Sequence, residues 1–165
     1  IGCKTVAIVS NDEKLEWCKE LGHSHGINYK KTANLTSEIQ NKCPKGVDVY
    51  FDNTGGPIND AVMENLNINA RIAVCGVIAL ADRIGKPDIG PRYWRQILVT
   101  RATITGFLVF DFAPEFKKAE NYIWNLVEKG GFKFKEDTSD GINTMASAFL
   151  DLLHSRNFGK RLIKI

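Results

Sequence analysis

The sequence predicts an α/β fold built on a doubly wound parallel sheet. Short apolar segments typical of buried strands alternate along the chain with segments whose apolar residues recur at helical spacing. The short segments are rich in Val, Ile, Tyr and Phe, which suit strands that are covered on both faces. Helices between successive strands favour parallel pairing, because a parallel neighbour needs a long crossover connection.

The first half of the chain contains most of the expected sheet. Strand patterns are found at residues 5–10, 27–29, 47–52 and 70–75. Helical spacing is found after residue 13, ending at Gly22, and then at residues 35–43 and 58–66. Ser10 and Glu13 have the spacing of a capping box, which predicts that Ser10 caps the first helix.

The second half begins with a loop rich in Gly and Pro at residues 77–91. The remaining pattern predicts a short helix near 93–98, a strand at 103–109, a long helix at 114–129, an exposed strand at 132–135, a helix at 142–153 and a closing strand at 161–165.

Composition excludes several classes of function. The chain has 165 residues, of which 44% are hydrophobic and 25% charged, and its formal net charge is +3. This charge is too small to indicate nucleic-acid binding, and no apolar segment is long enough to span a bilayer. No signal peptide is visible, so we expect a cytoplasmic protein. The cysteines lack metal-ligand spacing and are expected to be small buried residues rather than metal ligands: Cys3, Cys18, Cys43 and Cys75.

The strand at 47–52 runs directly into Asn53-Thr54-Gly55-Gly56. Ligands of open α/β sheets lie just beyond the carboxyl ends of the strands, and glycines let the backbone approach a ligand closely. The segment is therefore a candidate site. A plain turn between a strand and a helix would use the same residues, and this alternative stays open.

A dinucleotide-binding unit would begin with a strand, a Gly-rich turn and a helix, but no G-x-G-x-x-G pattern occurs here. In the usual doubly wound order, that first strand lies at the centre of the sheet. Either this chain is part of a longer protein, or it is not such a unit.

Seven segments, taken in order, resemble one family: Ser-Asn-Asp-Glu-Lys at 10–14, Ile-Asn-Tyr-Lys at 27–30, Tyr-Phe-Asp-Asn-Thr-Gly-Gly at 50–56, Arg-Ile-Ala-Val-Cys-Gly at 71–76, Gly-Pro at 90–91, Ile-Thr-Gly-Phe-Leu-Val at 104–109 and Asn-Phe-Gly-Lys at 157–160. This family is the zinc-independent medium-chain dehydrogenase/reductases of the prostaglandin reductase, leukotriene dehydrogenase and alkenal reductase type. The resemblance covers essentially the whole chain.

The resemblance implies a Rossmann-type sheet that lacks its first strand and its Gly-rich turn. Residues 1–135 would form most of an NADP(H)-binding domain, and residues 136–165 a helix and a strand that return to a GroES-like catalytic domain. It implies, as part of a longer chain, NADPH-dependent reduction of the carbon–carbon double bond of α,β-unsaturated ketones and aldehydes, without a metal and in a possible homodimer. The alternative is a reductase-like subunit or sensor that binds NADPH without turnover.

Two residues match the part of the family site that holds the adenosine 2′-phosphate of NADPH. Lys14 matches a phosphate-binding lysine, and Tyr29 matches a tyrosine near the same phosphate and its ribose. From the residues alone, Lys14 is more often a solvated surface lysine, and Tyr29 could equally be a core aromatic. Asp12 and Glu13 beside Lys14 suit the first turn of a helix.

The other matches follow the strand ends, and the family's catalytic tyrosine is missing. The remaining residues that the resemblance assigns to the cofactor are Asn53, Cys75, Gly76, Val77, Ile78, Phe107, Leu108, Val109 and Asn157. For Cys75, a small buried residue is the alternative. Ala81 stands where the family carries a tyrosine beside the substrate carbonyl, so no catalytic residue is assigned.

Overall fold

The computed structural model describes residues 2–81, 83 and 85–165; Asp82, next to Ala81, lies outside the described residues. The chain divides into two compact units, Ile1–Asp111 and Phe112–Ile165, and each is considered by itself. The predicted boundary at residue 135 concerned the two domains of the whole protein, and it stays a prediction.

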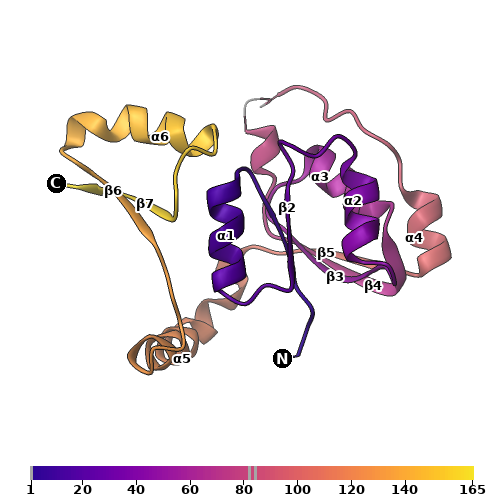
Figure 1. The fold of residues 1–165 in the computed structure, drawn as a ribbon, viewed down its shortest axis with the longest axis horizontal. Helices are drawn as coiled ribbons and strands as arrows, with labels where there is room; N and C mark the ends of the chain where they lie inside the picture. Colours follow the sequence, from indigo (N-terminus) through magenta and orange to yellow (C-terminus); the bar gives the residue numbers. More distant parts are fainter. Residues whose placement is uncertain (1, 82, 84) are drawn as a thin grey trace. The chain divides into compact units, whose positions relative to one another are not determined.

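Strands and helices alternate throughout the first unit (Figure 1). In chain order they are β1 (Val6–Val9), α1 (Asp12–Glu20), β2 (His25–Asn28), α2 (Leu35–Lys42), β3 (Val47–Asp52), α3 (Gly56–Met63), β4 (Leu66–Val74), the 3-10 helix η1 (Ile78–Leu80), α4 (Trp94–Thr100) and β5 (Thr103–Gly106). Among the described residues, β1 pairs with β2, and β4 lies between β3 and β5. All of these pairs are parallel, which confirms the predicted fold class.

Helices pack on both faces of this parallel structure. On β2, a Cβ atom at Gly26 would collide with the side chain of Leu15, so α1 lies directly against that face. The next residue, Ile27, points to the opposite face and belongs to the same buried cluster as Ile39 of α2. Successive strand residues point to opposite faces, so β2 is covered from both sides, as a doubly wound fold requires.

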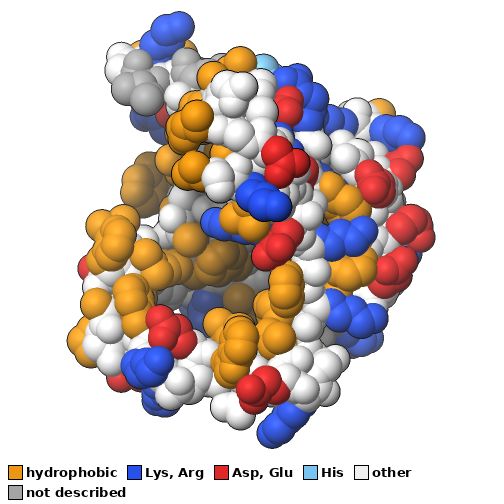
Figure 2. All heavy atoms as spheres, turned by 90° about the vertical axis from the view of Figure 1, so that its left-hand side faces the viewer, with side chains coloured by type: hydrophobic (Ala, Val, Ile, Leu, Met, Phe, Trp, Pro, Cys, Tyr) orange, Lys and Arg blue, Asp and Glu red, His pale blue; other side chains and the backbone are white. Residues whose placement is uncertain are grey.

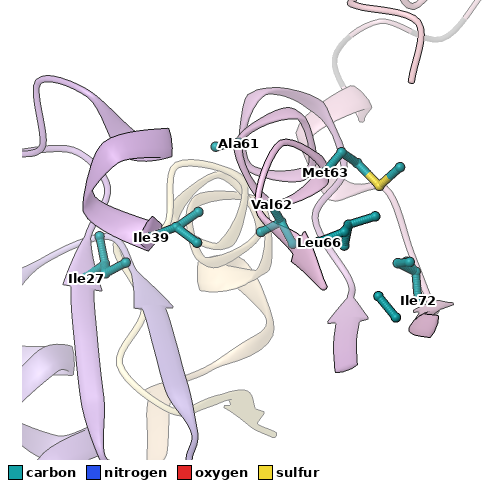
Figure 3. Close-up of a cluster of buried hydrophobic side chains, with 8 residues drawn as sticks. Ile27, Ile39, Ala61, Val62, Met63, Leu66 and Ile72 are labelled. Atoms are coloured by element: carbon teal, nitrogen blue, oxygen red, sulfur yellow. The ribbon is translucent and has the colours of Figure 1, made fainter. Parts of the chain in front are cut away.

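The buried cluster joins α2, α3 and β4 (Figure 3). Ala61, Val62 and Met63 form the last turn of α3 and are nearly inaccessible, as are Ala70 and Ile72 of β4. The helix ends three residues earlier than expected, because Leu66 already begins β4. Pairing of Leu66 with Val47 of β3 starts this strand four residues before the predicted range of 70–75, and it ends at Val74.

The strand β3 differs from the expectation of a fully buried strand. Tyr50 packs against the core, but Val49 and Phe51 on the opposite face are 54% and 62% exposed. Within this unit, one face of the apolar segment 47–52 is therefore packed against the core and the other is exposed. Exposed apolar residues on one face of a strand mark a surface that is suited to contact with another group.

The helix α1 is capped by Asn11 and not by Ser10. The Asn11 side chain accepts a hydrogen bond from the backbone N–H of Lys14 at 2.8 Å, while Asp12 and Glu13 lie in the first turn. The predicted capping box of Ser10 and Glu13 is wrong by one residue. β1 ends at Val9, so the chain needs Ser10 as the link into the cap.

The second unit contains α5 (Phe116–Glu128), β6 (Glu136–Asp140), the 3-10 helix η3 (Ile142–Thr144), α6 (Met145–Leu153) and β7 (Lys160–Lys164). A further 3-10 helix, η2 (Val109–Glu115), begins in the first unit and ends in the second. The expected strand at 132–135 is wrong: the strand is β6, which pairs in parallel with β7 from Glu136↔Lys160 onward. Arg161 binds Asp137 across this pair at 2.5 Å. Pairing with β7 sets the start of β6, whereas the alternation of apolar and polar residues predicted a strand at 132–135, just before it.

Figure 2 shows hydrophobic side chains in patches between acidic and basic ones on the surface. In α5, Tyr122 and Trp124 are about two-thirds exposed, at 66% and 64%. No helix among the described residues is long and apolar enough to cross a membrane.

The expectation of buried cysteines is wrong, because Cys3 and Cys75 are exposed and Cys18 and Cys43 are half-buried. Cys75 follows the end of β4 and Cys3 precedes β1, where the sheet no longer covers them.

The most deeply buried polar group is the carboxylate of Asp52, at the carboxyl end of β3, where the residue is 2% exposed. One oxygen accepts hydrogen bonds from the Tyr50 hydroxyl and from the backbone N–H groups of Thr54 and Gly55, each at 2.9 Å. The other oxygen accepts from Asn59 at 2.9 Å. Burial and the charge of Asp52 together raise the pKa of Tyr50, so this hydroxyl stays a donor.

Replacing Asp52 should therefore unfold the turn after β3. Asp52→Ala leaves two backbone donors and the Asn59 amide without their acceptor, and we expect the free energy of unfolding to fall by at least about 3 kcal/mol. Urea unfolding of the full-length protein measures the change. Asp48→Ala is the matched control, because Asp48 lies on the same strand but is exposed, and it should cost less than about 1 kcal/mol. Similar losses for the two variants would contradict the role of Asp52.

Candidate functional site

Three strand ends meet along one edge of the sheet. The register pairs Asp52 of β3 with Val74 of β4, and Val74 with Gly106 of β5. The residues that follow, Asn53, Cys75 and Phe107, therefore leave the sheet side by side. The structure thus brings together three of the segments predicted from sequence, at the edge where ligands of open α/β sheets bind.

The turns after β3 and β4 are held tightly against each other. The N–H groups of Cys75 and Gly76 donate to the carbonyl oxygen of Asp52 at 2.7 and 3.2 Å, and Ala79 N–H donates to the Thr54 carbonyl at 2.9 Å. The side-chain oxygen of Asn53 lies where a Cβ atom at Gly76 would be. Gly76 thus lets the Asn53 side chain approach this closely, because a Cβ atom there would displace it.

Gly55 and Gly56 complete this packing. Both have positive φ angles, of 68° and 58°, which L-residues with side chains rarely adopt. Cβ atoms at these positions would lie 3.3 Å from the side chains of Val77 and Ala79, respectively. The double glycine therefore has a structural role that the plain-turn alternative also allows, and it leaves backbone rather than side chains at this edge.

Apolar side chains border the same edge. Phe107 packs on Phe51 with ring centroids 6.3 Å apart and planes inclined by 54°. Leu108 and Val109 after β5, and Val77 and Ile78 after β4, are about half exposed or more. Together with the amide of Asn53, these groups form an edge that could hold a flat, partly polar ring such as a nicotinamide.

Lys14 and Tyr29 lie at a second set of strand ends, those of β1 and β2, which pair with each other and not with β3–β5. Val9 pairs with Asn28, and the N–H of Tyr29 donates to the Val9 carbonyl at 3.0 Å. The ammonium group of Lys14 donates to the Ser10 hydroxyl at 3.2 Å, which draws it back over the strand end. A cation beside the end of β1 suits an anionic ligand.

A polar network that we did not predict lies at the same strand ends. Asp12 accepts hydrogen bonds from the side chains of Asn28 and Lys31, both at 2.5 Å. The bond to Lys31, followed by the bond to Asn28, holds the pKa of Asp12 below its usual range. The sequence pattern explained Asp12 through the helix dipole, and only the pairing of β1 with β2 brings residue 31 close to residue 12.

Of two further residues discussed above, only Ala81 is linked to these strand ends. It follows η1, is exposed, and its N–H donates to the carbonyl of Ile78 at 3.2 Å. Asn157 belongs to the second unit, where its side chain donates to the Gly159 carbonyl at 2.9 Å. Among the described residues, no group of three or more His, Cys, Asp or Glu side chains could hold a metal ion.

A polar pocket of about 500 Å³ lies at the start of α3. Its lining includes Asp60 of α3 and residues 79–80, 83 and 88–93. Burial, followed by the charges of Asp60 and Glu64, raises the pKa of Tyr93 to about 12. None of the predicted cofactor residues is among those that line it, so we place the candidate site at the strand ends.

Comparison with known proteins agrees with this geometry. Residues 1–125 match the family model described as zinc-binding dehydrogenase. A putative NADP-dependent oxidoreductase of Bacillus subtilis is 39% identical over 99% of this chain, which covers 49% of that protein. Prostaglandin reductase 1 of Bos taurus is 32% identical over 99% of this chain and 50% of its own length. The chain thus spans about half the length of these relatives.

A solved structure is also similar. The structure of CurA in complex with NADPH from Vibrio vulnificus superposes with a TM-score of 0.89 and 31% identity, over 99% of this chain and 50% of that one. The family model covers three-quarters of the sequence, and the strand ends described above fall within it. This chain therefore belongs to the zinc-binding dehydrogenase family, that is, to the medium-chain dehydrogenase/reductases, and within it to the prostaglandin and alkenal reductase type.

Proposed function

We propose that the full protein is an NADPH-dependent reductase that acts on the carbon–carbon double bond of α,β-unsaturated ketones and aldehydes. The observation that carries the proposal is the convergence of Asn53, Cys75 and Phe107 at one edge, with Lys14 at the neighbouring strand ends. The NADPH complex of the similar Vibrio protein and the name of the Bacillus relative support the same cofactor.

The residues present fit this cofactor. Gly55, Gly56 and Gly76 keep side chains away from the turns, so a pyrophosphate and ribose can approach the backbone. Lys14 supplies a cation for the 2′-phosphate, and Tyr29 supplies an aromatic side chain near it. Phe107, Leu108 and Val109 offer an apolar border for the nicotinamide. Bound NADPH would supply the hydride, and these residues would orient it toward the substrate.

The substrate class rests on the relatives. The 2-alkenal reductase of Nicotiana tabacum, which is 30% identical over the whole chain and 48% of its own length, is named for an unsaturated aldehyde, and prostaglandin reductase 1 is named for a prostaglandin. Ala81 in place of the family tyrosine favours a second candidate, a subunit that binds NADPH without turnover. A homodimer and a cytoplasmic location stay predictions.

Steady-state oxidation of NADPH by the full-length protein with a panel of small enones and enals separates the two candidates. A reductase should oxidise NADPH at a rate that depends on the enone and saturates with its concentration. Tight NADPH binding with no turnover on any compound would favour the binding subunit, and failure to bind NADPH would contradict both.

Lys14 should decide between NADPH and NADH. We expect Lys14→Ala to weaken NADPH binding by roughly ten- to a hundred-fold, because a charge-assisted contact to phosphate is lost, and to leave NADH binding nearly unchanged. Fluorescence titration of the full-length protein measures both dissociation constants. Lys19→Ala is the control, because Lys19 lies on the same helix and pairs with the exposed Glu16. Equal losses for both cofactors would remove Lys14 from the phosphate site.

Restoring the family tyrosine should increase turnover. We expect Ala81→Tyr to raise turnover on small enones by roughly ten-fold, because a phenol can donate a hydrogen bond to the substrate carbonyl as negative charge develops on it. NADPH affinity should change little. The exposed position of Ala81 leaves room for the larger side chain. Unchanged kinetics in a normally folded variant would exclude residue 81 from the substrate pocket.

A further inference from the structure

The ion pair between Asp12 and Lys31 occupies the strand ends where the cofactor phosphate is expected. Lys31 lies in the turn after β2, and its ammonium group is 2.5 Å from one carboxylate oxygen of Asp12. The other oxygen accepts from the Asn28 side chain at 2.5 Å. Both members of the pair are exposed to solvent, with 72% of the Lys31 side chain and 55% of the Asp12 side chain accessible.

Asn28 fixes where this pair stands. It is the last residue of β2 and is only 8% exposed. Its carbonyl accepts from the N–H of Lys31 at 3.1 Å and from the Thr32 hydroxyl at 2.8 Å, while its side-chain oxygen accepts from the N–H of Lys30 at 3.2 Å. The turn that carries Lys31 is therefore tied to the end of β2, beside the start of α1.

Lys14 and Lys31 approach this region from two elements. Lys14 lies in the first turn of α1, and Lys31 lies on the turn after β2, while Val9 and Asn28 pair in register between them. Asp12, from the same turn of α1 as Lys14, holds the ammonium group of Lys31. An exposed ion pair is weak, so a phosphate with nearly two negative charges can take Lys31 from the single charge of Asp12.

We propose that Lys31 is a second cation for the 2′-phosphate of NADPH, and that Asp12 competes with that phosphate for it. The pair then sets the strength of the preference for NADPH over NADH. When the phosphate binds, Lys31 leaves Asp12 and contacts the phosphate, while Asp12 keeps its hydrogen bond from Asn28. This inference rests on the proposed function, because it requires that the strand ends take NADP(H).

The test uses dissociation constants of the full-length protein for NADPH and NADH in three variants. Lys31→Ala should weaken NADPH binding by about three- to ten-fold. This loss is smaller than that expected for an unpaired cation, because in the wild-type protein Lys31 must first leave Asp12 before it can contact the phosphate. Asp12→Asn keeps an acceptor for Asn28 and should strengthen NADPH binding by about three-fold. NADH binding should stay within about two-fold in both variants, since NADH lacks the phosphate.

The double variant tests the competition itself. With Asn at position 12 there is no pair to break, so Lys31→Ala should then cost about ten-fold or more in NADPH affinity. The matched controls are Lys42→Ala and Glu38→Gln, an ion pair on α2 with a separation of 3.3 Å, which should change neither dissociation constant. Melting temperatures of all variants report any loss of folded protein.

The outcomes separate this inference from the proposed function. If Lys14→Ala abolishes the preference for NADPH while Lys31→Ala changes nothing, Lys31 is a plain surface ion pair and the inference is wrong, although the reductase proposal stands. Weaker NADPH binding in Asp12→Asn would also overturn it, because Asp12 would then be a support for Lys31 and not a competitor. A wild-type protein without preference for NADPH would contradict both proposals.

Discussion

The buried carboxylate of Asp52 is the interaction on which the candidate site depends. A strand that stops at the edge of a sheet leaves backbone donors that must find acceptors, and here Asp52 satisfies the first two N–H groups of the turn. The same carboxylate holds the Tyr50 hydroxyl on the strand and the Asn59 amide on α3. The strand, turn and helix are thus joined at one point, and Asn53 is held where it meets Gly76.

From this point the site extends by contact between neighbouring strand ends. The carbonyl of Asp52 accepts from the residues after β4, and the Val74 carbonyl accepts from the N–H of Phe107 after β5 at 3.3 Å. Each link depends on parallel register, because only parallel strands end together at one edge. The glycines are part of the same arrangement, since Cβ atoms at positions 55, 56 and 76 would push the turns apart. Backbone chemistry therefore builds most of this edge, with few side chains.

Charge is distributed differently at the ends of β3–β5 and at the ends of β1 and β2, which pair separately. Around Asn53 and Phe107, most exposed side chains are apolar, which suits a ring and its ribose, and the Asp111 carboxylate there is bound to the N–H of Leu108 at 2.9 Å. Around β1 and β2, Lys14, Lys31 and Asp12 gather, which suits a group with more than one negative charge. This arrangement agrees with a dinucleotide that carries its extra phosphate at the adenosine end. Ala81 is not among the residues that the resemblance assigns to the cofactor, so the substrate side can differ from the family without change to the cofactor side.

The sequence by itself determined the fold class, the order of most strands and helices, and the segments that follow the strand ends. These properties depend on local periodicity and on short motifs, such as the double glycine after Asp52, that are visible in a single chain. The strand boundaries predicted from the sequence are wrong where pairing with a neighbouring strand sets them. The strand β6 begins at Glu136 because Lys160 pairs there, and β4 begins at Leu66 because Val47 of β3 pairs there.

Only the tertiary structure showed what the polar residues do. The sequence pattern indicated only that Asp52 belongs to a strand, yet its carboxylate is a buried acceptor of four hydrogen bonds. It explained Asp12 by the helix dipole, yet Asp12 binds Lys31. Residues 12 and 31 are brought together by the pairing of β1 with β2, and no spacing along the chain encodes that distance. Hydrogen bonds and ion pairs act over a few ångströms in space, whereas periodicity reports only which face of its own element a residue occupies.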